Sequence, residues 1–252
     1  MKEFKIDNLL VKQYENRTLM GEGAANDISA KINELLKSKA EINIIFAAAP
    51  SQNDVLLSLI NDKTIDWTKI NAFHMDEYVG LSKDAPQGFG NFLKEHIFSL
   101  VPFKSINYLN CEATDIEAEC ERYSKLLTEN PTDIVIMGIG ENGHIAFNDP
   151  PVADFNDSKM VKKVKLDEIC RQQQVNDGCF SDISLVPTHA MTLTVPTLVK
   201  APYLFCIVPA KTKANAVKET LTGSIDEHCP ATILRKQKEA ILYLDNESSG
   251  LL

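Results

Sequence analysis

Apolar and polar positions follow one another along the chain in a pattern typical of an α/β protein. Short apolar runs, which indicate buried strands, alternate with longer segments whose apolar residues recur at helical spacing. The pattern predicts strands at Ile42–Ala47, Lys69–His74, Ser105–Tyr108, Asp133–Met137, Ala190–Val195, Tyr203–Val208 and Ala240–Leu244. It predicts helices at Ala24–Leu36, Asp54–Ile60, Phe89–Leu100, Asp115–Leu127 and Lys213–Leu221. Such an order builds a mostly parallel sheet covered on both faces, so we expect a three-layer, doubly wound, Rossmann-like α/β fold.

The chain length favours one domain. Its 252 residues fit a single α/β domain, and no internal repeat or low-complexity tract divides them. The composition shifts once, at Ala153–Cys179, which is rich in Asp, Lys and Gln. This segment is either a surface excursion or a mobile lid over the site. We therefore expect one domain over residues 1–252, in which residues 153–179 form either a lid or a surface excursion.

Charge and cysteine content exclude several classes of protein. The net charge is −9 and the basic residues are scattered, which argues against a surface for nucleic acid or anionic membranes. The N-terminus carries no apolar signal segment, and no apolar run approaches the roughly 20 residues that span a bilayer. The six cysteines form no C-x-x-C pair, as expected of reduced thiols. These features predict a cytoplasmic protein that binds neither nucleic acid nor membranes.

The segment Ile134–Pro150 carries the clearest candidate chemistry. An apolar run ends in three closely spaced glycines that lead to His144, with Asn142 and Asp149 on either side. Ligands of open α/β sheets bind beyond the carboxyl ends of the strands, so a titratable group just past a strand is well placed for catalysis. His144 is therefore a candidate for proton transfer, and the alternative is a histidine that only satisfies a turn.

The same glycines spell G-x-G-x-x-G, the fingerprint of dinucleotide-binding proteins. That fingerprint has physical meaning only where a helix opens at once and points its N-terminus at a pyrophosphate. Here Pro150 and Pro151 follow closely, and no helical apolar stripe lies between the glycines and the prolines. The pattern thus argues against nucleotide binding.

A second candidate feature is a pair of acids directly after a strand. Asp76 and Glu77 follow the predicted strand that ends at His74. Adjacent carboxylates at a strand end repel one another and lose solvation, which suits a general base with a raised pKa. The alternative is a helix-capping or solvated acid pair.

The two candidate features together resemble those of a known enzyme family. The segments Phe73–Leu81 and Met137–Pro150, with the stretches MDEYVGL and GHIAFN, resemble glucosamine-6-phosphate deaminases and their galactosamine-6-phosphate relatives. That superfamily includes 6-phosphogluconolactonases and shares its general fold with ribose-5-phosphate isomerase and coenzyme A transferases. The resemblance covers nearly the whole chain.

The resemblance implies roles for four residues. Asp76 matches the base that removes the C2 proton of the open-chain sugar, and His144 matches the residue that assists ring opening. Asn142 and Asp149 match the two polar partners of that histidine. Asp149 stands where glutamate is usual, so its carboxylate reaches one methylene less far.

Phosphate recognition departs from the pattern that the resemblance implies. In the family a loop rich in Gly, Thr and Ser follows the first sheet strand and binds the sugar phosphate. The matching residues 47–52 contain no glycine, and Pro50 has no N–H to donate, so the loop binds phosphate in an altered geometry or binds something else. Substrate contacts are expected from the loop, the second carboxylate and two cations: Ala48, Ala49, Ser51, Glu77, Arg171 and Lys213.

The implied reaction needs only acid–base chemistry. Moving a proton between adjacent carbons and hydrolysing an imine requires a carboxylate and an imidazole, with no redox cofactor and no metal. We expect an enzyme that converts glucosamine 6-phosphate or galactosamine 6-phosphate into a ketose 6-phosphate and ammonia. The alternatives are a 6-phosphogluconolactonase-type hydrolase and a catalytically silent sugar-phosphate-binding sensor. The sequence leaves a homo-oligomer open.

Overall fold

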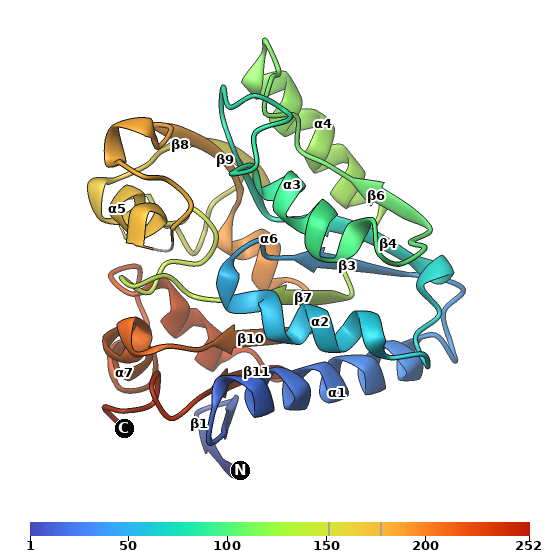
Figure 1. Cartoon of the computed structure of the whole chain (residues 1–252), viewed down its shortest axis with the longest axis vertical. Helices are drawn as coiled ribbons and strands as arrows, with labels where there is room; N and C mark the ends of the chain where they lie inside the picture. The colour runs from blue at the N-terminus through green and yellow to red at the C-terminus, as the bar shows by residue number, and fades with distance from the viewer. Residues whose placement is uncertain (151, 177) are drawn as a thin grey trace.

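A mostly parallel sheet forms the centre of the molecule (Figure 1). The structure is a computed structural model, and it describes residues 1–150, 152–176 and 178–252. Within these residues the main sheet has eight strands in the order β1-β2-β11-β10-β7-β3-β4-β6. Its strands are β1 Lys2–Ile6, β2 Leu9–Gln13, β3 Ile42–Phe46, β4 Ile70–His74, β6 Ser105–Asn107, β7 Ile134–Met137, β10 Tyr203–Val208 and β11 Ala240–Leu244. Strand β1 runs antiparallel to β2, and the other pairs are parallel, which confirms the predicted fold class.

Helices cover both faces of this sheet. They are α1 Arg17–Leu35, α2 Asn53–Asn61, α3 Phe89–Leu93, α4 Ile116–Glu129, α5 Glu168–Asn176, α6 Val195–Val199 and α7 Ala214–Thr222. Side chains of β3 alternate between the two sides: Ile44 packs with α1 and α2, whereas Ile45 packs with α4, α6 and α7. Each face thus contributes one large apolar cluster, as a strand period of two requires.

A second, smaller sheet lies at one end of the main sheet, and α5 lies beside this second sheet (Figure 1). Its antiparallel strands are β5 Asp76–Tyr78, β9 His189–Leu193 and β8 Val161–Lys165, in that order. Asp76 pairs with Thr192 and Tyr78 with Ala190. The predicted strand Ala190–Val195 therefore exists as β9, but it belongs to this sheet because β5 and β8 pair with it.

The segment Ala153–Cys179, predicted as an excursion or a lid, forms β8 and α5. Residue 177, inside the expected lid range, lies outside the described residues, as does Pro151 before that range. The other predicted strands and helices match observed elements within a few residues at most of their ends. Two helices differ more. Helix α1 begins at Arg17 instead of Ala24, and the helix predicted around α3 is not continuous. The predicted helix Phe89–Leu100 is divided into α3 and a π-helical turn at Lys94–Phe98. Among the described helices, none combines the length and apolar character that a bilayer crossing requires.

Candidate active site

A cavity of about 450 Å³ opens where the parallel strands end. Its lining includes the segments that directly follow β3, β4, β7 and β10, at residues 47–52, 75–76, 138–140, 209–210 and 212–213. The carboxyl ends of parallel strands meet at one edge of a sheet, so residues distant in sequence converge there. The cavity contains Asp76, His144, Ala48, Ala49, Ser51 and Lys213 from the predicted site.

His144 is held by both of its predicted partners. Its Nδ1 lies 2.7 Å from Oδ1 of Asn142 and 3.0 Å from Oδ1 of Asp149. The amide of Asn142 in turn donates to Oδ1 of Asp149 at 2.9 Å. Both atoms facing Nδ1 are acceptors, so we assign the ring proton to Nδ1, which leaves Nε2 as a proton acceptor. The structure thus brings together three residues that were predicted to act as a unit.

Asp149 stays ionised in this arrangement. Burial raises the pKa of its carboxyl, but the hydrogen bond and electrostatic attraction of His144 and the hydrogen bond from Asn142 outweigh burial and hold the pKa below its ordinary value. A carboxylate that stays ionised can both orient the imidazole and stabilise its protonated form.

The loop that carries His144 is shaped by its neighbours. The ring packs directly over Gly140, where a Cβ atom would lie 2.1 Å from Cε1 of His144. Asn148 is fully buried and its amide donates to the carbonyls of Ile145 and Leu193, both at 2.8 Å. No helix opens within residues 141–150, so the dinucleotide fingerprint lacks the helix it requires.

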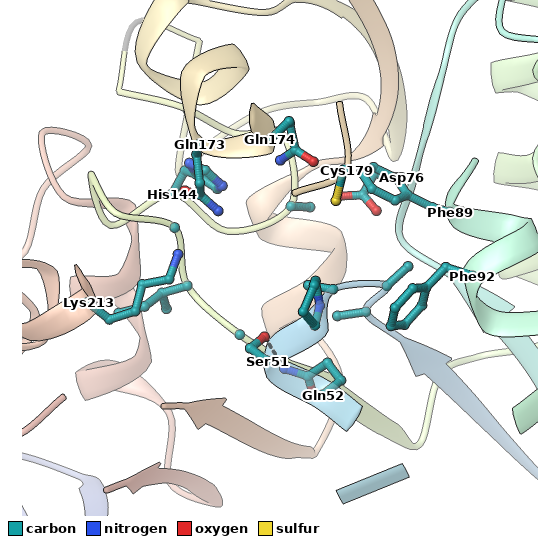
Figure 2. A pocket seen from close by; sticks show the side chains of 18 of the residues that line it. Ser51, Gln52, Asp76, Phe89, Phe92, His144, Gln173, Gln174, Cys179 and Lys213 are labelled. Carbon is teal, nitrogen blue, oxygen red and sulfur yellow. Dashed lines mark hydrogen bonds between the residues drawn. The ribbon is translucent and has the colours of Figure 1, made fainter. Parts of the chain in front are cut away.

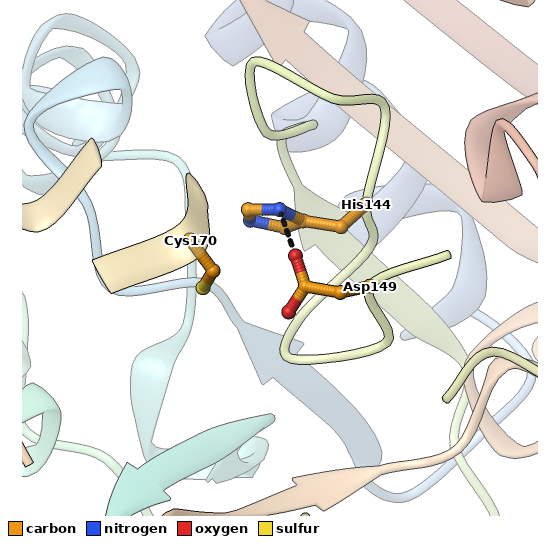
Figure 3. A group of neighbouring side chains, drawn as sticks. All are labelled: His144, Asp149 and Cys170. Atoms are coloured by element: carbon orange, nitrogen blue, oxygen red, sulfur yellow. Dashed lines mark ion pairs between the residues drawn. The ribbon is translucent and has the colours of Figure 1, made fainter. Parts of the chain in front are cut away.

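Cys170 of α5 lies beside the buried pair (Figure 3). The ligand atoms of His144, Asp149 and Cys170 all lie within 4.8 Å of one another, which is the donor set of a zinc-type site. Burial, followed by the negative charge of Asp149, raises the pKa of the thiol far above its ordinary value. A metal would need the deprotonated thiolate, which the raised pKa of Cys170 disfavours. The residues present therefore suit the acid–base arrangement better than a metal.

Asp76 faces the cavity from the start of β5 (Figure 2). The residue is 8 % exposed, and its side chain makes no hydrogen bond to another residue in the described part of the chain. Burial and then the charge of Glu77 raise the pKa of the Asp76 carboxyl well above its ordinary value. A buried, unpartnered carboxylate with a raised pKa is suited to accept a proton from a bound molecule.

Glu77, which was predicted to contact substrate, does not line the cavity. Successive side chains of a strand point to opposite sides, so Glu77 points away from Asp76. Its Oε1 accepts the backbone N–H groups of Tyr78 and Phe89, and its Oε2 accepts that of Gly90 at 2.9 Å. Burial raises the pKa of Glu77 in spite of these bonds. The helix-capping alternative that the sequence left open for the acid pair thus fits Glu77, which caps the start of α3.

His74 fixes the chain just before Asp76. Its Nε2 accepts the N–H of Leu109 at 2.9 Å, and its Nδ1 lies 3.0 Å from the carbonyl oxygen of Asp76. Because Nε2 accepts, Nδ1 carries the proton and donates to Asp76. Complete burial lowers the pKa of His74 to about 4, so the ring is neutral and holds the strand end in place.

The end of the cavity opposite Asp76 offers a cation and a short polar turn. Pro50–Gln52 form a turn of 3₁₀ helix ahead of α2, and the side chain of Gln52 donates to Oγ of Ser51 at 3.0 Å. Lys213, from the turn after β10, is 6 % exposed and points into the cavity (Figure 2). This end is therefore the natural place for an anionic group.

Arg171 does not lie where a phosphate contact requires. It is absent from the cavity wall, and its Nη2 donates to the carbonyls of Ile183 at 2.6 Å and Val186 at 2.9 Å. The expected phosphate contact is corrected to a structural one: the guanidinium holds α5 against the loop before β9.

Sequence reasoning missed several residues of the cavity wall. Arg17, at the start of α1, lines its mouth and is bonded to Asp54 and to the carbonyl of Pro50. Phe89 and Phe92 of α3 supply an apolar wall. Gln173 and Gln174 of α5 lie above the cavity in Figure 2. None carries a local signal, since each reaches the cavity only through the packing of its helix.

Fold and site define an α/β enzyme with an acid–base pair in its cavity. A family model described as glucosamine-6-phosphate isomerases/6-phosphogluconolactonase matches residues 15–243. The chain is 36% identical over 212 residues to glucosamine-6-phosphate deaminase of Listeria welshimeri, covering 84% of this chain and 88% of the relative. It is 35% identical over 220 residues to that of Bacillus cereus, covering 87% and 82%. The chain belongs to this family, as its resemblance implied.

Solved structures agree with this assignment. A monomeric glucosamine-6-phosphate deaminase superposes with a TM-score of 0.87 at 28% identity, covering 96% of this chain and 99% of that one. A 6-phosphogluconolactonase from Thermotoga maritima superposes with a TM-score of 0.76 at 21% identity, covering 94% and 99%. The second likeness shows the shared fold alone.

Proposed function

We propose that the chain converts a 2-amino-2-deoxyhexose 6-phosphate, either glucosamine 6-phosphate or galactosamine 6-phosphate, into a ketose 6-phosphate and ammonia. The observation that carries this proposal is the placement of one unpartnered carboxylate, Asp76, in the same cavity as a histidine held by Asn142 and Asp149. The names of the relatives from Listeria and Bacillus support the same activity.

The chemistry divides between the two groups. The ring opens when the anomeric hydroxyl gives up a proton and the ring oxygen gains one, a transfer that His144 can mediate through Nε2. Asp76 then takes the C2 proton of the open-chain aldehyde, and C1 gains a proton as the enolamine becomes a ketimine. Water adds to the ketimine carbon, and ammonia leaves to give the ketose.

The phosphate end is proposed on the same basis. Lys213 supplies a charge, and Ser51 with the backbone of residues 48–51 supplies polar groups beside it. The remaining predicted features, a single catalytic domain over residues 1–252, action without a metal and a cytoplasmic location, stay predictions. Two apolar clusters on the two faces of one sheet support the single domain.

The test is ammonia release by the purified protein in buffer that contains a chelator. We expect ammonia and ketose 6-phosphate in equal amounts from at least one of the two amino-sugar phosphates. Asp76→Asn protein prepared identically controls for contaminating deaminases. Hydrolysis of 6-phosphogluconolactone without ammonia release would identify a lactonase. Calorimetric binding of the sugar phosphates without turnover would identify a sensor.

A further inference from the structure

Helix α5 is fixed over the cavity from two sides. Arg171 bonds it to the loop before β9, as described above. On the other side Oε1 of Gln173 accepts the N–H of Glu141 at 2.9 Å, which ties the helix to the loop that carries His144. These two attachments leave the position of the next residue, Gln174, well defined.

Gln174 is a buried amide that faces the cavity without a protein partner. The residue is 7 % exposed, and its side chain makes no hydrogen bond within the described residues. Figure 2 shows it above the cavity, with Gln173 and His144 on one side and Cys179 and Asp76 on the other. Burying an amide without a partner is unfavourable, so this position suits an amide that a bound molecule completes.

The rest of the cavity determines which part of a sugar phosphate would meet this amide. Lys213 lies at the anionic end, and Asp76 and His144 lie where C1 and C2 must react. The wall formed by Phe89 and Phe92 offers nothing to a hydroxyl. A hexose 6-phosphate placed between these ends still carries hydroxyls on C3 and C4.

A hydroxyl both donates and accepts, as does a carboxamide, so each group can satisfy the other. We propose that Gln174 is a specificity-determining residue that hydrogen-bonds a hydroxyl on C3 or C4 of the substrate. The inference rests on the proposed function, which places the reacting carbons beside Asp76.

The experiment is a binding cycle between one side chain and one hydroxyl. Glucosamine 6-phosphate or its C4 epimer, whichever binds more tightly, is compared with its 3-deoxy and 4-deoxy analogues by calorimetry in an Asp76→Asn background, where no turnover occurs. Gln174→Leu should weaken binding of the parent sugar about 2- to 12-fold, the effect of one neutral hydrogen bond. With one of the deoxy analogues, Gln174→Leu should not weaken binding, since that analogue already lacks the hydroxyl that Gln174 would bind.

Gln172→Leu is the matched control, because Gln172 is an exposed glutamine on the same helix whose amide bonds Asn176. It should bind all sugars as the parent protein does. Equal losses by Gln174→Leu on the parent and on both analogues would indicate a merely structural effect and overturn the inference, as would no loss at all.

Ammonia release by the protein with Asp76 intact separates the two proposals. Turnover without any coupling at Gln174 overturns the inference alone. Coupling without turnover supports the inference and overturns the proposed function. Failure of every sugar phosphate to bind overturns both.

Discussion

Oδ1 of Asp149 lies 3.0 Å from Nδ1 of His144, although aspartate is one methylene shorter than the glutamate that the family resemblance leads one to expect. The backbone after His144 compensates. Residue 146 adopts a left-handed conformation with φ +50°, and Asn148 bonds the turn to itself and to β9. The turn therefore carries Asp149 back to the ring, and the shorter side chain suffices.

Asp149→Asn should lower turnover of the cyclic substrate by about 10²- to 10⁴-fold with little change in KM, because the asparagine keeps the shape but no longer stabilises the imidazolium. Steady-state kinetics measure this. Asp84→Asn, at an exposed carboxylate, should leave turnover unchanged. Wild-type turnover by Asp149→Asn would show that His144 works without a charged partner.

Asp76 and Glu77 provide a matched pair with opposite expectations. Asp76→Asn should abolish exchange of the substrate C2 proton with solvent while sugar-phosphate binding persists. Its Tm at pH 8 should equal or exceed that of the wild type: the folded-state pKa of Asp76 is raised, so its ionisation reduces stability as pH rises through that pKa.

Glu77→Gln should instead lower Tm, because both oxygens of Glu77 accept backbone N–H groups and the amide of glutamine has only one acceptor oxygen. Proton exchange by NMR and thermal unfolding separate the two effects. Exchange at the wild-type rate by Asp76→Asn would show that another group is the base.

The pH profile of C2 exchange should report Asp76. The ionised carboxylate is the active form and its pKa is raised, so the exchange rate should rise with pH through a limb that lies above the ordinary aspartate value of 3.8. Asp149 adds no limb above 3.8, since its pKa is lowered from that value. Rates measured in D₂O from about pH 4 to 9 test this, and a flat profile would contradict it.

Gly140→Ala tests the close approach of the His144 ring. The new Cβ would lie 2.1 Å from Cε1, so the ring must move by an amount that typically costs roughly 100-fold in turnover. Gly250→Ala, where the nearest atom would be a carbonyl oxygen at 3.3 Å, should retain full activity. Equal activity of the two variants would mean that the ring position is not critical.

The central strands could be predicted because strands covered on both faces are continuous apolar runs, as in β7, where all four residues are apolar and buried. The first turns of α1 were missed because glycines lower helix propensity. Gly21 is nevertheless required there, since a Cβ would lie 2.5 Å from Cβ of Asp54 where α1 crosses α2. Strand β5 was also missed, because its three residues are extended only through pairing with distant β9.

In the candidate site, too, some residues could be predicted from local sequence and others could not. Asp76, His144, Asn142 and Asp149 lie in two short segments at strand ends, so local sequence was sufficient to group them. Arg171 could not be placed, since its direction depends on carbonyls of residues 183 and 186. The three successive glutamines of α5 are alike in sequence and differ only in the side of the helix that meets the cavity.

The last prediction concerns the anionic end of the cavity. Lys213→Ala should raise KM for the sugar phosphate about 10- to 150-fold, the loss of one charge-assisted hydrogen bond to phosphate. Lys211→Ala, which removes an exposed lysine from the same turn, should leave KM unchanged. With an unphosphorylated amino sugar, wild type and both variants should be equally poor.

Arg171→Ala should behave differently from Lys213→Ala. It removes two bonds that hold α5, so it should lower Tm, while the preference for phosphorylated over unphosphorylated sugar stays as in the wild type. If Arg171→Ala loses that preference, Arg171 contacts the phosphate after all. If the wild type prefers the unphosphorylated sugar, Lys213 and the glycine-free loop at residues 47–52 recognise some group other than phosphate.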